Sequence, residues 1–316
     1  DPAARLADFN PPQRGYRALR KELKRLTNAP GRATRSAARL DPDSRLGAPL
    51  TDIVDPSDDE GSVRPRSRLR RVAQSGAYDA AVGGSPRERM DILANMEIWR
   101  WEPRDMGERR IEVNVPDFSV AVLEGDAVLH RARVIVGKPD TPTPIFSNVM
   151  RYVLINPSWR VPESIIRKEM MSRLAYLSRH GYQVKTVDGR LTLRQLPGEE
   201  NALGRLAFMF PNDHSVYLHD TPAQDLFAAD RRAFSHGCVR VEDALRLAEL
   251  VLGWPQDRIE AAFGDSERTV FLPRPLPIHI EYFTEFVDEF GDLQQRADVY
   301  GVTHKVAAAL SAERQD

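Results

Sequence analysis

The stretch YLHDTPAQDLFAADRRAFSHGCVR, residues 217–240, contains Cys238, the only cysteine in the 316-residue chain. His219 lies 19 residues before this cysteine, and His236 lies two residues before it. A thiolate is a strong nucleophile, and a neighbouring histidine can take the proton that the thiol must lose. These residue types in one short stretch therefore favour nucleophilic acyl transfer.

The residues around Cys238 suit such a reaction. Gly237 permits a tight turn, whose backbone N–H groups can stabilise an oxyanion. A helix is predicted to begin three or four residues after the cysteine, and its free N–H groups would stabilise a thiolate. Two alternatives use the same atoms: an inert buried cysteine, or a zinc site formed by His219, His236 and Cys238. The zinc site is disfavoured because the sequence indicates no fourth ligand.

Strands, rather than helices, are expected to position these residues. Alternating apolar residues predict a strand over 109–115 and a hairpin over 119–137. His219 would then lie at the end of a later strand, where functional residues often occur. Further strands are expected over 150–159, 204–210 and 215–220, and a helix over 242–253 that ends at Gly253.

Two helices are predicted in the N-terminal part. Apolar residues at spacings of three and four indicate one over 16–26. A capping-box pattern at Ser85 begins the other. Trp99 and Trp101, at the end of this second helix, are expected to anchor a core. Between the helices the periodicity fades, and the arginine-rich run at 64–71 is typical of a solvated linker, with contact to an anionic surface as the alternative.

Composition excludes some classes of function. The chain has 45 basic and 46 acidic residues, a balance that gives no reason to expect nucleic acid as a partner. It has no run of 18 apolar residues, so we expect no transmembrane segment. One cysteine cannot form an internal disulfide or a multi-cysteine zinc module. Because the chain begins at Asp1 and its first methionine is Met90, we expect a processed or truncated product.

The pattern of His219, fifteen intervening residues and then Ser235-His236-Gly237-Cys238 resembles the signature of the L,D-transpeptidase catalytic domain family (YkuD-like), which remodels peptidoglycan. Residues 9–23, 141–165, 217–227 and 277–301 are similar to the larger Gram-negative, periplasmic branch of that family. The resemblance implies an α+β fold: a β-rich catalytic domain with a helical capping insert and a mainly helical N-terminal scaffold region.

The resemblance also assigns roles to residues. It implies that Cys238 is the nucleophile, that His219 is its base, and that the backbone carbonyl of Asp220 orients the base. Arg240 stands where the family commonly has asparagine. The implied substrate and oxyanion pocket comprises Ser235, His236, Gly237, Arg240 and Tyr217, with no metal and no cofactor.

By the same resemblance, the thiolate attacks the carbonyl of the third stem residue of peptidoglycan, a diamino acid, and expels the terminal D-alanine. An amine then takes the thioester; it would be the diamino-acid side chain of another stem, or a protein amine. Carbapenems are expected as covalent inhibitors, and the periplasm as the location. The alternatives are an L,D-carboxypeptidase, which uses water, and a non-catalytic wall-binding protein.

A long insertion at about 162–198 separates two predicted core strands, where a connection of about 2–6 residues would suffice. It contains a predicted helix over 163–181 and a hairpin around Asp188 and Gly189. The apolar stripe of this helix, over 165–174, is expected to pack on the face that carries His219 and Cys238. We therefore expect a cap that limits water access, with a loop packed elsewhere as the alternative.

The expected organisation has four parts. Residues 1–84 form a scaffold helix and charged linker, and 85–106 form a connecting helix. The catalytic domain spans 107–275, and residues 276–316 form a C-terminal extension that packs on the scaffold. Between residues 71 and 85 there is no room for the small peptidoglycan-binding module that larger relatives often carry.

Overall fold

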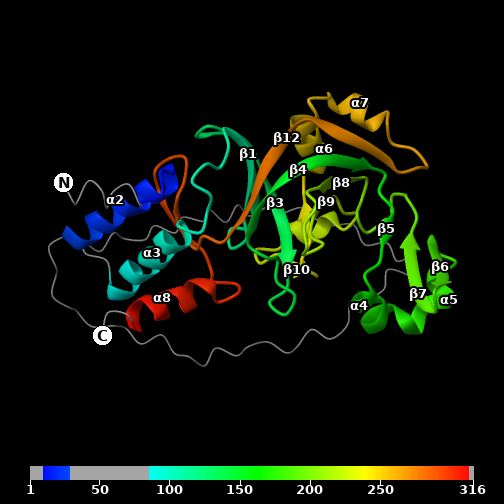
Figure 1. The fold of residues 1–316 in the computed structure, drawn as a ribbon, viewed down its shortest axis with the longest axis horizontal. Coiled ribbons are helices and arrows are strands. Elements are labelled where there is room, and N and C mark those ends of the chain that lie inside the picture. Colours follow the sequence, from blue (N-terminus) through cyan, green and yellow to red (C-terminus); the bar gives the residue numbers. More distant parts are fainter. Residues whose placement is uncertain (1–9, 29–84, 313–316) are drawn as a thin grey trace, which may run out of the picture.

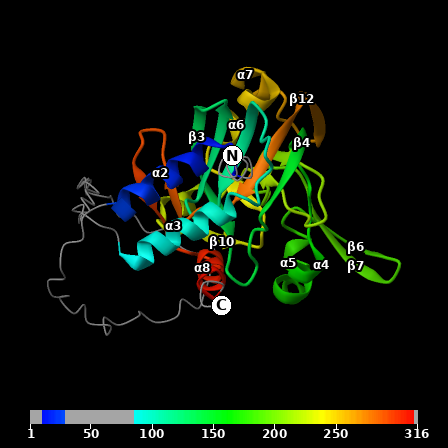
Figure 2. The same ribbon diagram turned by 60° about the vertical axis from the view of Figure 1, so that its left-hand side comes forward.

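The computed structural model describes residues 10–28 and 85–312 (Figure 1). A large sheet lies at the centre, the N-terminal and C-terminal helices lie together at one end, and the insertion lies at the other (Figures 1 and 2). This mixed architecture confirms the expected α+β class. The predicted charged linker and its arginine-rich run fall outside the described residues.

A nine-stranded sheet forms the catalytic region. Its strands are β1 (Arg109–Asn114), β2 (Ser119–Glu124), β3 (Ala127–Gly137), β4 (Phe146–Ile155), β8 (Leu206–Met209), β9 (Leu218–His219), β10 (Ala233–Ser235), β11 (Val239–Val241) and β12 (Arg268–Glu281). Pairing follows the order β3-β11-β9-β8-β4-β12-β1-β2, and β2 pairs again with β3, so the strands close into a ring. β10 pairs with the end of β3. The expected hairpin over 119–137 is confirmed as β2 and β3.

The apolar core lies inside this ring. Alternate residues of the longer strands, such as Ile111 and Val113 of β1, are buried in one cluster, as period-two side-chain alternation requires. Helix α6 (Ala244–Leu252) packs into the same cluster. Asp243 caps it, and it ends at Gly253 in the left-handed conformation, as predicted. The short helices α7 (Gln256–Glu260) and η3 (Gln224–Ala228) complete this region.

A second core holds the helical scaffold together. Its elements are α2 (Arg14–Asn28), α3 (Pro86–Ile98), α8 (Val302–Ala312) and the hairpin of β13 (Glu285–Val287) and β14 (Leu293–Gln295). The capping box is confirmed: Ser85 Oγ accepts a hydrogen bond from the Glu88 N–H, at 3.1 Å. Trp99 is buried and stacks on Phe283, with 4.3 Å between ring centroids. The expectation for Trp101 was wrong: it lies in the turn beyond the helix and is 52% exposed.

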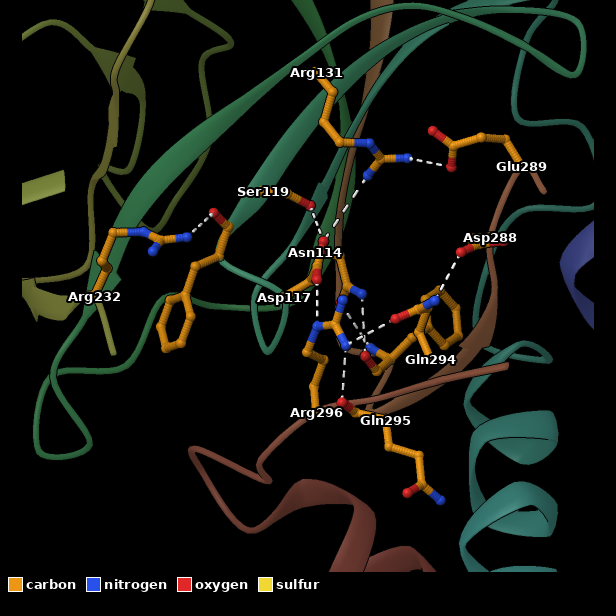
Figure 3. Close-up of polar contacts among 12 residues, drawn as sticks. Asn114, Asp117, Ser119, Arg131, Arg232, Asp288, Glu289, Gln294, Gln295 and Arg296 are labelled. Atoms are coloured by element: carbon orange, nitrogen blue, oxygen red, sulfur yellow. Dashed lines mark hydrogen bonds and ion pairs between the residues drawn. The ribbon is translucent and has the colours of Figure 1, made fainter. Parts of the chain in front are cut away.

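The segment after residue 275 contributes to both the nine-stranded sheet and the helical scaffold. The expected boundary at 275 falls inside β12, which continues as a strand of the sheet to Glu281. Further along, Arg296 Nε donates to Asp117 Oδ1 at 2.5 Å, and Arg131 Nη2 lies 3.2 Å from Glu289 Oε2 (Figure 3).

No helix in the described ranges combines the length and the apolar character needed to cross a membrane.

The insertion forms a small unit with its own core. Its strands are β5 (Trp159–Arg160), β6 (Tyr182–Val187) and β7 (Arg190–Gln195). The helix predicted over 163–181 is confirmed in part: residues 163–177 are helical, but in four short pieces of different type. These are α4 (Glu163–Ile165), a π-helical turn η1 (Ile166–Met170), a 3₁₀ turn η2 (Met171–Arg173) and α5 (Leu174–Leu177).

The predicted packing of the apolar stripe was wrong. Ile166 and Leu177 are buried against Leu193 of β7 and Val161. The insertion's own hairpin therefore covers these side chains, because it is the apolar surface nearest in the chain.

Candidate active site

Two short parallel strands bring Cys238 and His219 together. In the pairing of β9 with β11, Val239 lies opposite Leu218, and Arg240 lies opposite His219. Leu218 and Val239 are buried in the core of the ring. Because side chains alternate between the faces of a strand, the flanking residues share the opposite face. These residues are Tyr217, His219, Cys238 and Arg240.

His219 is held in one tautomer. Its Nδ1 lies 2.5 Å from the backbone oxygen of Asp220. A carbonyl can only accept a hydrogen bond, so Nδ1 carries the proton and Nε2 is left to accept one. The Asp220 backbone is itself fixed, because its N–H donates to the Leu206 carbonyl at 2.9 Å. The structure thus gives Asp220 the orienting geometry that the family resemblance implies.

The imidazole of His219 is uncharged at neutral pH. It is 4% exposed, and this burial, together with the positive charge of Arg240, lowers its pKa to about 3. The hydrogen bond to Asp220 opposes the shift only in part. A neutral imidazole is the form that can act as a base, but it cannot stabilise a thiolate as a cation.

The thiol of Cys238 is half-buried, with Sγ 3.9 Å from the Ser215 carbonyl oxygen. Burial raises its pKa, while a backbone hydrogen bond from Tyr217 and the charge of Arg240 act in the opposite direction. The helix expected three or four residues after the cysteine begins slightly later. Strand β11 follows the cysteine directly, and α6 begins only at Ala244, because residues 239–241 pair with β3 and β9.

The loop before the cysteine is internally bonded. Ser235 is buried; its Oγ donates to the Cys238 carbonyl at 2.5 Å and accepts from the Gly237 N–H at 3.1 Å. Gly237 has φ of +117°, a region that residues with a side chain rarely adopt. The Cys238 N–H makes no hydrogen bond within the described part of the chain. It is therefore a donor that remains for an oxyanion, whereas the Gly237 N–H is occupied.

Arg240 and Tyr217 complete the face around the sulfur. The Nε of Arg240 is buried without a partner among the described residues. Burial lowers the pKa of Arg240, and a negative charge on Cys238 would raise it. Burial and the proximity of Cys238 raise the pKa of Tyr217, so its hydroxyl stays a neutral donor. The ring centroids of Tyr217 and His219 are 5.7 Å apart.

His236 does not join this face. It is exposed, and its Nε2 lies 2.8 Å from Oε1 of Glu169 in the π-helical turn of the insertion. This contact connects the insertion to the loop that carries Cys238. Sequence reasoning missed Glu169, because no local pattern distinguishes it from the other charged residues of that segment. Within residues 10–28 and 85–312, no three His, Cys, Asp or Glu side chains gather as a metal site.

The chain is similar to proteins of one family. A provisionally named L,D-transpeptidase of Haemophilus influenzae is 29% identical over 226 residues, covering 63% of this chain and 45% of that protein. The chain thus spans less than half of that relative's length. An L,D-transpeptidase structure from Mycobacterium smegmatis is 15% identical, with a TM-score of 0.32, covering 55% of this chain and 58% of that one. L,D-transpeptidase 3 from Mycobacterium tuberculosis, in complex with a faropenem-derived adduct, is 15% identical, with a TM-score of 0.30 and coverage of 55% and 60%.

The family model of the L,D-transpeptidase catalytic domain (YkuD) matches residues 108–271. This range covers more than half of the chain and contains Tyr217, His219, Cys238 and Arg240. It ends inside β12, the strand that continues into the C-terminal segment. The chain therefore belongs to the L,D-transpeptidase catalytic domain family.

Proposed function

We propose that this protein is a peptidoglycan L,D-transpeptidase that transfers an acyl group through Cys238. One observation carries the proposal: β9 and β11 place Cys238 and His219 on one face, with His219 Nδ1 bonded to the Asp220 carbonyl. A thiol beside a base that a third group orients is the arrangement that activates a cysteine nucleophile. A wall-binding protein would have no need for this arrangement.

The first half-reaction forms a thioester. Nε2 of His219 takes the thiol proton as Sγ bonds to the carbonyl carbon of the donor, and the carbonyl oxygen gains the negative charge. The Cys238 N–H can donate to this oxygen. The intermediate collapses as the C–N bond to D-alanine breaks, and the proton passes from His219 to the leaving amine.

The second half-reaction returns the enzyme. An acceptor amine attacks the thioester carbon, the C–S bond breaks, and a proton passes through His219 back to the sulfur. The diamino-acid side chain of a second stem would give a crosslink between third residues. Water as the acceptor would give an L,D-carboxypeptidase instead.

The surroundings of the sulfur suit a peptide that carries carboxylates. The positive charge of the Arg240 guanidinium can pair with a carboxylate of the stem, and the hydroxyl of Tyr217 can donate to it. The insertion reaches the same loop through Glu169 and His236, which supports a role as a cap that favours an amine over water. We propose the periplasm as the location, because a protein that acts on peptidoglycan stems must reach the cell wall.

The test is incubation with a purified disaccharide carrying a tetrapeptide stem, followed by mass analysis of the products. Release of D-alanine together with dimers joined through third residues supports the proposal. Release of D-alanine without dimers would identify a carboxypeptidase. Retention on wall material with no product, in wild type and in Cys238→Ala alike, would identify a wall-binding protein.

A further inference from the structure

Tyr300 belongs to the C-terminal segment between β14 and α8, yet its hydroxyl bonds to a loop beside the active site. Its oxygen donates to the Gly137 carbonyl at 2.6 Å and accepts from the Thr143 N–H at 3.2 Å. One phenol therefore joins the two ends of the loop that connects β3 to β4. The two partners lie 163 and 157 residues away from it in the sequence.

Thr143 carries this connection to the catalytic loop. It is 1% exposed, and its Oγ1 donates to the Gly237 carbonyl at 2.8 Å and accepts from the Gly137 N–H at 2.9 Å. Because the hydroxyl acts as donor and acceptor at once, its orientation is fixed. The loop has little freedom to shift, since a Cβ on Gly137 would lie 2.2 Å from the Thr141 carbonyl oxygen.

The Gly237 carbonyl belongs to the same peptide unit as the Cys238 N–H. In a planar trans peptide these two groups point in opposite directions. A hydrogen bond that holds the carbonyl towards Thr143 therefore aims the N–H away from it, on the side left for the oxyanion. No other group of the described chain occupies this N–H.

The backbone of Tyr300 is itself held in place by Tyr282. Its backbone N–H donates to the hydroxyl of Tyr282 at 2.7 Å, and that hydroxyl donates to Asp298 Oδ1 at 2.6 Å. Tyr282 is fully buried in the main core, at the end of β12. The chain of contacts thus runs from the core through the C-terminal segment to the peptide beside the nucleophile.

We propose that Tyr300 is a positioning residue, which acts through Thr143 to aim the Cys238 N–H at the oxyanion. This role rests on the proposed function. It makes the C-terminal segment, which lies beyond the residues matched by the family model, part of the acylation machinery.

The test compares two reactions of the same sulfur. Acylation by a carbapenem develops an oxyanion, whereas alkylation by iodoacetamide does not. Tyr300→Phe keeps the ring and removes the hydroxyl, so the acylation rate constant should fall by about 10- to 100-fold, as small misplacements do in such sites. The alkylation rate should stay unchanged. Thr143→Val should behave alike, and the double variant should lose no more than the single ones, because both act on one peptide.

A matched control is Tyr16→Phe, which removes a buried hydroxyl that bonds to Asn10 in the scaffold. It should leave both rates unchanged. If Tyr300→Phe acylates as fast as wild type, or if both reactions slow in parallel, the positioning role is refuted. If wild type is not acylated by any carbapenem or stem donor, the proposed function fails instead. Melting temperatures of all variants identify any that fail to fold, and Thr143→Val then carries the test.

Discussion

Cys238 and His219 should rest as a neutral thiol and a neutral imidazole, and not as a thiolate–imidazolium pair. Burial and Arg240 hold the pKa of His219 at about 3, and burial raises that of Cys238 above its ordinary value of 9.0. The fall in the pKa of His219 from 6.5 to about 3 alone corresponds to on the order of 5 kcal/mol against charging the imidazole in the free protein. The proton should therefore move only as the acyl donor is attacked.

The assay is the rate of alkylation by iodoacetamide between about pH 5 and about pH 10, followed by intact mass, since the thiolate is the reactive form. The rate should rise with pH throughout this range, with no plateau near neutrality. His219→Ala should change it little at pH 7, yet should slow carbapenem acylation by about 10²- to 10⁴-fold, the usual contribution of a general base. Fast alkylation that is independent of pH at mildly acidic pH, and is lost in His219→Ala, would refute the reasoning.

Three further predictions concern charged groups. Arg240→Met removes the cation beside the sulfur, so the pKa of the thiol measured by ultraviolet absorbance should rise, whereas Arg240→Lys should keep it nearer the wild-type value. Glu169→Gln should weaken the link to His236 and shift products from dimers towards hydrolysis, with Glu163→Gln on the same insertion as the control; equal product ratios would contradict the cap. Burial raises the pKa of Glu285 from 4.5 to about 8, so the folded state keeps this proton over a pH range in which the unfolded state loses it, and the free energy of unfolding falls as pH rises from 4.5 to 8. Glu285→Gln should therefore raise the melting temperature near pH 8 and change it little near pH 5, and the reverse order would contradict this sign.

Local patterns were sufficient to predict most elements around the site. Period-two apolar residues marked the strands, and the capping box at Ser85 and the left-handed Gly253 marked helix ends. The spacing of His219 and Cys238 pointed to one family, whose match covers both residues. These signals succeed because each depends on neighbours in the sequence.

The features that sequence reasoning missed depend on distant partners. The helix expected in the insertion breaks into short turns over the insertion's own hairpin, so periodicity alone could not place its apolar stripe. The helix expected shortly after Cys238 begins later, at Ala244, because the intervening residues pair with β3 and β9. Tyr300 and Glu169 reach the catalytic loop from segments far away in the chain, and nothing local to them predicts it.

The central claim, a cysteine acyl transfer at Cys238, is tested most directly by intact-mass analysis after incubation with a carbapenem. The strained acyl bond of this inhibitor replaces the stem peptide, and the ring-opened product stays on the sulfur. Wild type should gain the mass of one inhibitor molecule, and Cys238→Ala should gain none. An unmodified wild type, or an equal adduct on Cys238→Ala, would contradict the account.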